Sequence, residues 1–260
     1  MSFHATKISV FIITLNEEDR IEKAIKSVKP IADEVLVIDS GSKDKTCEIA
    51  RNLGATVIFN EWRGYGLQKI FGEKSCKNDW VFNIDADEEV SPELVIELKK
   101  LFDNGRNDDI SGFRIKIVNK FRFEDKPKKL AYYYNQLRLY NRNYAGFKDS
   151  TVHDSVELKQ ENFKIVNLKN IIYHQSFRSF AHWIDKINSY SSMQAKDAVK
   201  KRKIPTNIKI ISVGFFAFFK AYFVRRYFIY GFDGIIYSAL FAFSRFAKAI
   251  KTREENKAAN

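Results

Sequence analysis

The chain has 260 residues, of which 45% are hydrophobic and 29% are charged. This length is sufficient for one α/β domain with an extension, and the composition excludes a disordered chain. The net charge of +12 leaves nucleic acid, anionic lipid and an acidic substrate open as partners.

The positive charge is concentrated near the C-terminus. Residues 201–260 contain twelve Lys and Arg against three Asp and Glu, a net charge of +9. The preceding 200 residues therefore carry only +3 of the total of +12. The partner that this charge attracts is expected to contact the C-terminal part of the chain.

Two features indicate a reducing, cytoplasmic environment. The only two cysteines, Cys47 and Cys76, lie in different segments and form neither a disulfide framework nor a zinc-binding spacing. Residues 1–7 are polar and lack the apolar stretch of a secretory signal.

The first part of the chain alternates strand-like and helix-like segments. Short apolar, β-branched runs predict strands at 8–13, 34–38, 55–59 and 80–84. Helical spacing predicts helices at 18–28, 44–53, 67–77 and from Ser91 to about Gly105. Ser91 as N-cap and Pro92 at the first helical position mark the start of the last helix. This alternation predicts the α/β class, with a mostly parallel sheet flanked by helices.

After about residue 112 the alternation changes. Strands are predicted at 112–118, 137–140 and 167–173, and a basic, aromatic excursion at 116–134. A helix is predicted at 177–203, where Pro205 ends it. We therefore expect an α/β domain at 1–175 and a helical extension at 176–260.

The C-terminal extension combines aromatic and basic residues. Its aromatic residues include Phe215, Phe216, Phe218, Phe219, Tyr222, Phe223, Tyr227, Phe228 and Tyr230. Lys220, Arg225, Arg226 and Asp233 interrupt them, so no window is expected to provide the roughly 20 apolar residues of a membrane-spanning helix. The pattern favours helices that lie at a membrane surface, and an ordinary core helix packed on the sheet is the alternative.

Polar residues follow three of the predicted strands directly. The three segments are Thr14-Leu15-Asn16-Glu17, Asp39-Ser40-Gly41-Ser42 and Asp85-Ala86-Asp87-Glu88. Ligands of open α/β sheets bind beyond the carboxyl ends of the strands, so these segments predict one binding site.

The acidic residues in these segments suit nucleotide and metal binding. Asp85 and Asp87 could hold Mg²⁺ or Mn²⁺, which prefer carboxylate oxygens, and the alternative is a solvated acidic turn before a helix. Asp39 could accept hydrogen bonds from ribose hydroxyls or a base N–H, while Ser42 or Asp44 could simply cap the next helix. The helix that follows Thr14–Glu17 would favour an anion at its N-terminus.

Three stretches resemble the family 2 glycosyltransferases, which have a GT-A (Rossmann-like) fold. They are Val10–Glu17, Val37–Thr46 and Asn83–Glu88, in matching order and spacing. Within this family the chain most resembles the lipopolysaccharide core β-1,4-glucosyltransferases of Gram-negative bacteria. The stretches that carry this closer resemblance are Trp62–Lys69, Val152–Asp154, Phe219–Tyr222 and Phe232–Gly234.

The resemblance implies a metal-dependent site for a nucleotide sugar. The residues expected to bind the donor are Thr14, Leu15, Asn16, Glu17, Asp39, Ser40, Gln68, Lys69, Asp85 and Ala86. Asp85 and Asp87 are expected to hold the divalent cation, with Asp87 as the more direct ligand.

The resemblance also implies inversion at the anomeric carbon, which needs a general base. Asp154 is the candidate base, although similar sequences have the longer Glu at this position. His153 is the second candidate, with a structural, hydrogen-bonded role as its alternative. His174 could approach the metal, but a structural role is preferred for it.

The expected function is transfer of a single sugar, glucose from UDP-glucose, to a lipopolysaccharide or lipooligosaccharide core. Single transfer is expected because the Gln-x-x-Arg-Trp motif of processive members is absent from the sequence. Alternative acceptors are a polyprenyl-phosphate carrier and a capsule intermediate. A nucleic-acid-binding protein and an inactive scaffold are less favoured, because three intact acidic segments suit a metal and repel nucleic-acid phosphate.

The expected partners are therefore a nucleotide-diphosphate sugar, a lipid-linked saccharide acceptor and an anionic membrane surface, without nucleic acid. The protein is expected to be cytoplasmic and peripheral at the inner face of the cytoplasmic membrane.

Overall fold

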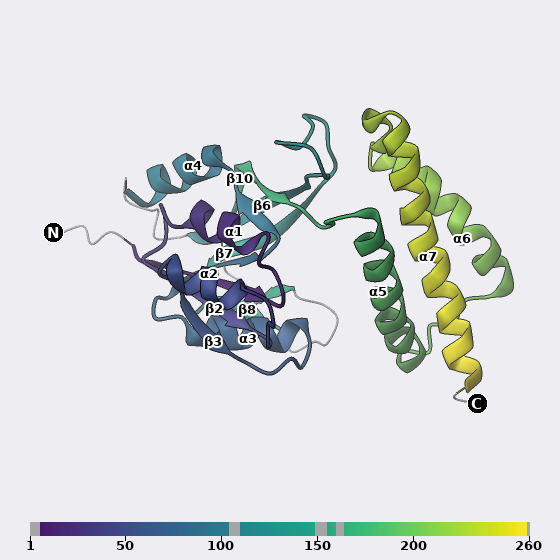
Figure 1. The fold of residues 1–260 in the computed structure, drawn as a ribbon, viewed down its shortest axis with the longest axis horizontal. Coiled ribbons are helices and arrows are strands. Elements are labelled where there is room, and N and C mark those ends of the chain that lie inside the picture. Colours follow the sequence, from purple (N-terminus) through teal and green to yellow (C-terminus); the bar gives the residue numbers. More distant parts are fainter. Residues whose placement is uncertain (1–5, 104–109, 149–154, 160–163, 259–260) are drawn as a thin grey trace. The chain divides into compact units, whose positions relative to one another are not determined.

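The computed structural model describes residues 6–103, 110–148, 155–159 and 164–258, and confirms the α/β class (Figure 1). The chain forms two compact units. The first contains residues 1–118 and 133–174, and the second contains residues 119–132 and 175–260. The sequence-based division placed residues 119–132 in the first domain. They belong to the second unit because Phe121 packs against Trp183 and Tyr237 of the helices.

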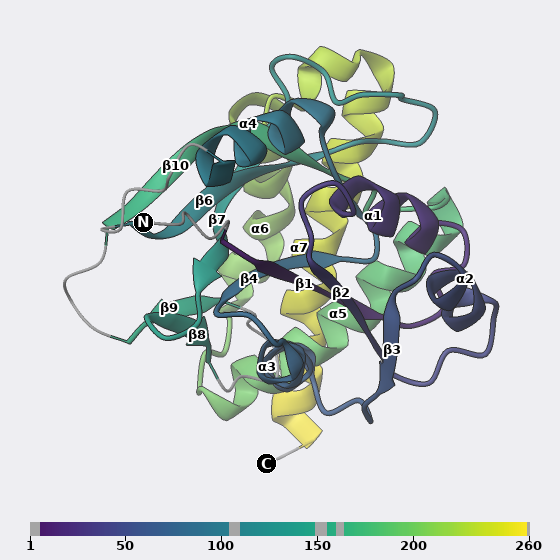
Figure 2. The ribbon, with the colours of Figure 1, turned by 90° about the vertical axis from the view of Figure 1, so that its left-hand side faces the viewer.

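An eight-stranded sheet forms the centre of the first unit, in the order β3-β2-β1-β4-β7-β6-β10-β5 (Figure 2). The strands are β1 (Ile8–Thr14), β2 (Glu34–Asp39), β3 (Thr56–Phe59), β4 (Trp80–Asp85), β5 (Glu88–Val90), β6 (Ile110–Asn119), β7 (Tyr133–Asn141) and β10 (Lys164–His174). Parallel pairing joins β3, β2, β1 and β4, as the alternation predicts. Antiparallel pairing joins β7 to β4 and β6, and β5 to β10. A separate hairpin consists of β8 (Ala145–Phe147) and β9 (Val156–Leu158).

Four helices lie in the described part of this unit, and all four were predicted. They are α1 (Ile21–Val28), α2 (Thr46–Asn52), α3 (Tyr65–Ser75) and α4 (Pro92–Asp103). Helix α1 begins three residues later than expected, because the Glu17 carbonyl accepts from the amides of Arg20 and Ile21 in a preceding turn.

The core lies on both faces of the sheet. Val10 and Ile12 of β1 pack on one face in a cluster with Ile21 and Ile25 of α1. Phe11 belongs to the cluster on the opposite face, as the alternation of side chains along a strand requires. Helix α3 approaches this face closely, since a Cβ on Gly72 would lie 2.5 Å from the Phe11 ring. Burial on both faces explains why β1 is apolar without interruption from Val10 to Ile13.

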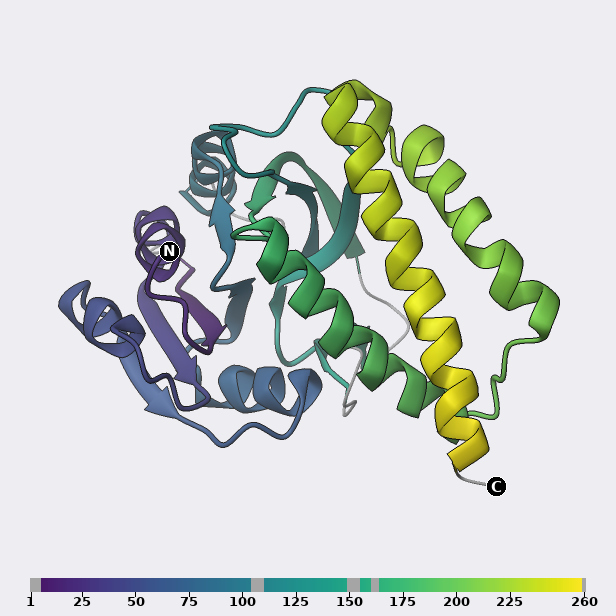
Figure 3. The same ribbon diagram turned by 45° about the vertical axis from the view of Figure 1, so that its right-hand side comes forward.

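Three long helices form most of the second unit, and α7 packs against both α5 and α6 (Figure 3). They are α5 (Phe180–Lys200), α6 (Asn207–Phe219) and α7 (Phe232–Ala258), with a π-helical turn η1 (Lys220–Val224) and a 3₁₀ helix η2 (Tyr227–Tyr230) between the last two. Ser179 caps α5 by accepting from the His182 amide at 3.1 Å. Thr206 caps α6 in the same way, after Pro205 has ended the preceding segment.

One expectation about the extension is wrong. Residues Asn207–Val224 form an 18-residue helical segment with a mean hydropathy of 1.4, which is long and apolar enough to cross a membrane. The segment is continuous because helix α6 runs directly into the π-helical turn. It contains two charged residues, Lys209 and Lys220. This result concerns length and composition alone. Only 17% of the segment is buried within the protein.

Candidate functional site

The three polar segments meet at one edge of the sheet. The parallel register places Thr14 beside Asp39 and Ile13 beside Asp85, so the carboxyl ends of β1, β2 and β4 lie together. The structure thus brings together the segments that the sequence places up to about seventy residues apart.

The first two segments form one cross-linked loop system. The Asn16 amide donates to Ser42 Oγ at 2.8 Å, and Asn16 Oδ1 accepts from the Lys43 amide at 2.9 Å. Asn16 has a φ of 53°, a left-handed conformation that asparagine tolerates better than most residues. The Glu17 amide donates to Thr46 Oγ1 at 2.7 Å. Asn16 therefore fixes the shape of the loop at this edge.

Asp39 is buried and is bound by its own loop. Its carboxylate accepts from the Gly41 amide at 2.9 Å and from the Ser42 amide and hydroxyl at 3.0 and 2.5 Å. Gly41 has a φ of 105°, a conformation that favours glycine. The contact of Asp39 with the nucleotide remains a prediction.

The remaining predicted donor residues line the same edge or support it. Gln68 Nε2 donates to Ser40 Oγ at 3.0 Å, and Gln68 Oε1 accepts from Asn60 at 2.7 Å. Thr14 and Ala86 are buried, whereas Leu15 is 48% exposed. Gln68 is itself fully buried, so it supports Ser40 from behind.

A buried cluster of charged residues surrounds Asp85. Lys69, which is buried on α3, places its ammonium 2.9 Å from Asp85 Oδ1. Arg138 of β7 lies 3.6 Å from Asp85 Oδ2 and 2.7 Å from Glu88 Oε1. Its other amino group donates to Asn83 Oδ1 at 2.8 Å. Lys69 therefore contacts the acidic segment in this structure.

Sequence reasoning missed Arg138 and the role of Glu88. Residues 137–140 predicted only a strand, and Arg138 comes beside Asn83 and Glu88 because β7 pairs with β4. The signal in the sequence was an arginine within the otherwise apolar run 137–140. Because a buried arginine requires a charged partner, this pattern indicated an acidic residue nearby.

The cluster has opposite effects on its two buried carboxyl groups. Burial opposes ionisation of Asp85, but Lys69 and Arg138 outweigh it and lower the pKa of Asp85. Burial raises the pKa of Glu88 to about 7, against the attraction of Arg138. Asp85 is consequently a carboxylate at neutral pH, held in a fixed orientation.

Asp87 faces a different set of partners. Its Oδ2 lies 3.3 Å from His174 Nε2 and 3.8 Å from Arg20 Nη1. His174 ends β10, and its register opposite Glu88 of β5 carries the imidazole to Asp87. Arg20 also forms an ion pair with Glu17. The sequence favours a structural role for His174. In the structure this histidine contacts Asp87 of the acidic segment at 3.3 Å.

A divalent cation fits the pair formed by Asp87 and His174. A carboxylate and an imidazole are both ligands of Mn²⁺ and related ions, and His174 Nε2 already faces the carboxylate. Among the described residues, no group of three or more His, Cys, Asp and Glu side chains could hold a metal.

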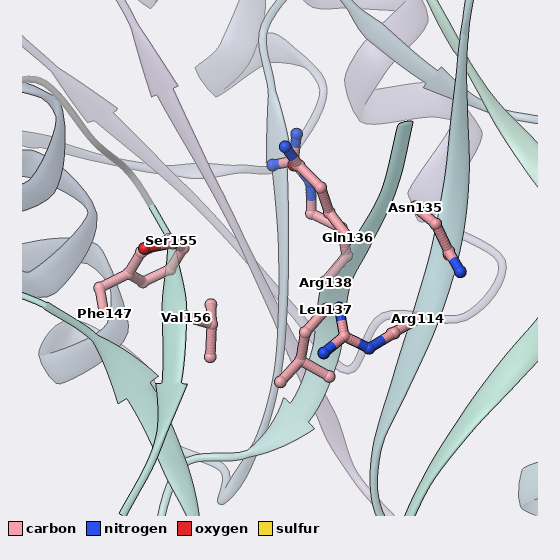
Figure 4. A pocket seen from close by; sticks show the side chains of 8 residues that line it. All are labelled: Arg114, Asn135, Gln136, Leu137, Arg138, Phe147, Ser155 and Val156. Atoms are coloured by element: carbon pink, nitrogen blue, oxygen red, sulfur yellow. The ribbon is translucent and has the colours of Figure 1, made fainter. Parts of the chain in front are cut away.

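A cavity of about 310 Å³ adjoins this cluster at Arg138 (Figure 4). Figure 4 shows residues of β6 and β7 on one side and Phe147, Ser155 and Val156 on the other. Arg114, Asn135 and Gln136 provide polar groups to its wall. A cavity with several hydrogen-bonding groups beside a fixed carboxylate suits a polyhydroxylated ligand.

The two predicted catalytic residues, His153 and Asp154, lie outside the described residues. The assignment of the general base therefore remains a prediction.

Comparison with known proteins identifies the family. The model of glycosyl transferase family 2 matches residues 9–157. An uncharacterized glycosyltransferase of Rickettsia bellii is 48% identical over 254 residues, which cover 95% of this chain and 86% of the relative. The lipopolysaccharide core biosynthesis glycosyltransferase LpsC of Rhizobium meliloti is 30% identical over 260 residues, covering 93% and 91%.

A solved structure of glucosyl-3-phosphoglycerate synthase from Mycobacterium tuberculosis, in complex with Mn²⁺, UDP and glucosyl-3-phosphoglycerate, is a more remote match. It is 20% identical, with a TM-score of 0.46 and coverage of 78% of this chain and 82% of that chain. The family match, in contrast, spans more than half of the chain and includes all three converging segments. The chain therefore belongs to glycosyl transferase family 2.

Proposed function

We propose that this protein is an inverting glycosyltransferase that moves one glucose from UDP-glucose to a lipopolysaccharide or lipooligosaccharide core. The convergence of Asp39, Asp85 and Asp87 at one sheet edge carries the proposal. The similarity to LpsC, whose name assigns it to lipopolysaccharide core biosynthesis, supports the class of acceptor.

In the proposed reaction, Asp87 would hold the divalent cation together with His174. Metal binding by Asp85, which the sequence also predicts, stays a prediction. The cation, when bound, would neutralise the negative charge that develops on the leaving diphosphate. Asp85, kept ionised and oriented by Lys69 and Arg138, would accept hydrogen bonds from hydroxyl groups of the donor.

The proposed transfer needs no reactant besides the donor and the acceptor. An acceptor hydroxyl attacks the anomeric carbon and gives its proton to the general base, for which Asp154 is the prediction. The bond from the anomeric carbon to the diphosphate oxygen breaks, and UDP leaves on the opposite face. The cavity beside Arg138 would hold the sugar ring during this step, because Arg114, Asn135 and Gln136 can bond its hydroxyl groups.

Calorimetric titration tests the donor assignment. UDP, UDP-glucose and GDP-mannose are titrated into the purified protein with and without Mn²⁺. We expect the two uridine nucleotides to bind in a Mn²⁺-dependent manner and GDP-mannose to bind more weakly. Folded protein that binds none of these nucleotides in the presence of Mn²⁺ would contradict the assignment. Transfer of radiolabelled glucose to a truncated lipopolysaccharide core then tests the acceptor.

We also propose that the helical unit binds the anionic inner face of the cytoplasmic membrane. Apolar residues recur every three or four positions along α6, and their side chains are largely exposed: Ile208 79%, Ile211 80%, Phe215 63% and Phe219 44%. An exposed apolar stripe of this extent fits an interfacial helix, and residues 201–260, which include α6, carry a net charge of +9.

Co-sedimentation with vesicles tests this membrane proposal. The wild-type protein is expected to sediment with vesicles that contain phosphatidylglycerol, and Phe215→Ser with Phe219→Ser is expected to remain mostly in solution. Ile96→Ser, which changes an exposed apolar residue of α4, is the matched control and should behave as wild type. Wild-type protein that stays in solution with anionic vesicles would refute the proposal.

A further inference from the structure

A second cavity, of about 480 Å³, lies wholly within the helical unit. The loop 119–132, the start of α5 and the segment from η2 to the first turns of α7 form its wall. None of the residues that line it belongs to the predicted donor or metal site.

Flat aromatic rings form much of the cavity wall. Phe177 stacks on Trp183 with 3.9 Å between ring centroids and an interplanar angle of 9°. Phe121 stacks on Tyr237 with corresponding values of 4.0 Å and 10°. The two pairs are linked through Phe121 and Trp183, whose centroids are 6.0 Å apart. These contacts hold the rings in place, so a ligand would meet a surface that is already ordered.

The same wall carries charged groups of both signs. Glu124 and Asp233 contribute carboxylates, and Lys120, Arg122 and Lys128 contribute cations. Glu124 Oε2 accepts from the Phe121 amide at 3.1 Å, which ties this carboxylate to the aromatic stack. The cavity is therefore neither purely apolar nor simply basic.

Lys128 is held above one of the aromatic rings. Its ammonium donates to the Ile229 carbonyl at 3.1 Å and lies 5.0 Å from the centroid of the Tyr230 ring. These two contacts fix a cation at the wall of the cavity, where an anionic substituent of a ligand could meet it.

Phe123 has an unusual backbone conformation at the wall of the cavity. This residue lines the cavity, its side chain is 92% exposed, and its φ of 70° is unusual for an aromatic residue. The Arg122 guanidinium lies 4.8 Å from the centroid of its ring. Strained residues of this kind cluster at ligand-binding segments, where the fold retains them despite a cost of order 1–3 kcal/mol.

The combination of groups distinguishes between classes of ligand. An acyl chain would cover the half-buried Lys120 and Glu124 without forming hydrogen bonds to them, which is unfavourable. A sugar ring can place its C–H face on the aromatic rings and its hydroxyl groups on Glu124 and Asp233. The cations match a phosphate group.

We propose that this cavity binds a pyranose ring that carries a phosphate group. This binding does not depend on the proposed glycosyltransferase function. The volume lies within the range of about 300–1,000 Å³ that is usual for small-molecule sites.

Nuclear magnetic resonance of the tryptophan indole groups tests the proposal. The chain has three tryptophans, and only Trp183 lines this cavity. Mannose 6-phosphate, mannose and inorganic phosphate are titrated separately into the full-length protein, and the Trp183 signal is identified with Trp183→Phe. We expect mannose 6-phosphate to shift the Trp183 signal saturably, with a Kd of about 1 mM. Mannose should act at least about tenfold more weakly, and phosphate should not shift it.

Two lysines provide a matched pair of variants. Lys128→Gln removes a cation from the cavity wall and is expected to weaken mannose 6-phosphate binding about tenfold while leaving mannose unaffected. Lys129→Gln removes an exposed neighbour that does not line the cavity and should bind as wild type. An equal loss of mannose 6-phosphate binding in both variants would show that Lys128 makes no specific contact with the phosphate group.

The remaining outcomes separate this proposal from the donor assignment. An unchanged Trp183 signal at about ten times the expected Kd would overturn the cavity proposal. An equal shift with inorganic phosphate alone would also overturn it, because the site would then recognise no sugar. Titration of the same samples with UDP and Mn²⁺ gives an independent result. Intact UDP binding without a Trp183 response refutes the cavity alone, and the reverse result refutes the donor site alone.

Discussion

Asp87→Ala is expected to abolish the Mn²⁺-dependent part of UDP-glucose binding and to lower glucose transfer by at least about 100-fold. Loss of groups that only support a metal ligand already costs about 10–100-fold in metal affinity or activity, so loss of a ligand should cost no less. In the structure, Asp87 faces His174 at 3.3 Å and lies at the site edge, where a diphosphate could share the cation. Calorimetry with and without Mn²⁺ measures the binding, and radiolabel transfer measures the activity.

Asp79→Ala is the matched control for this experiment. Asp79 lies just before β4, at the opposite end of the strand from the site, and its side chain is 59% exposed. This variant should bind UDP-glucose as the wild-type protein does. His174→Ala should weaken the Mn²⁺-dependent binding in the same direction as Asp87→Ala. An Asp87→Ala protein with undiminished Mn²⁺-dependent affinity would show that the metal does not bind at this residue.

Arg138→Met is expected to destabilise the folded protein by about 3–5 kcal/mol, the usual cost of breaking a buried ion pair. Arg138 is 5% exposed, and its removal would leave Glu88 and Asp85 without their shared cation. Chemical unfolding in urea, followed by circular dichroism, measures the change in the free energy of unfolding. The measurement should be made at pH 8, where the wild-type Glu88, with a pKa of about 7, is mostly ionised.

The pH dependence of this loss has a defined sign. Burial raises the pKa of Glu88 in the folded protein, so its ionisation costs stability as the pH rises through the folded value. Without Arg138 this cost grows, and the difference between wild type and variant should therefore be larger at pH 8 than at pH 5.

A double variant separates the lost charge balance from the lost packing. Arg138→Met combined with Glu88→Gln should recover part of the stability, because it removes one of the uncompensated charges. Arg114→Met, at an exposed position of the neighbouring strand β6, should change stability by less than about 0.5 kcal/mol. A single variant that costs less than about 1 kcal/mol, or a double variant no more stable than the single, would refute this account of the cluster.

The amino-acid sequence by itself predicted the strands and helices whose signals lie in residues that are close together in the chain. The apolar runs at β1, β2 and β4 are local signals, and so are the three polar segments that follow them. Once these strands are taken as parallel, Asp39 and Asp85 must reach the same edge, because the connecting helices return the chain to the start of each strand. The family and the convergence of these strand ends therefore followed from local patterns.

The tertiary structure alone decided which distant residues complete the site. Arg138 meets Glu88 because β7 pairs antiparallel with β4, and His174 meets Asp87 because β10 pairs with β5. Side-chain periodicity indicates which face a residue occupies but not which strand lies beside it, so neither contact could be predicted. The loop 119–132 is a similar case, because the stacking of Phe121 on Tyr237 unites residues more than one hundred positions apart. Such contacts depend on strand order and side-chain packing, which emerge only when the whole chain has folded.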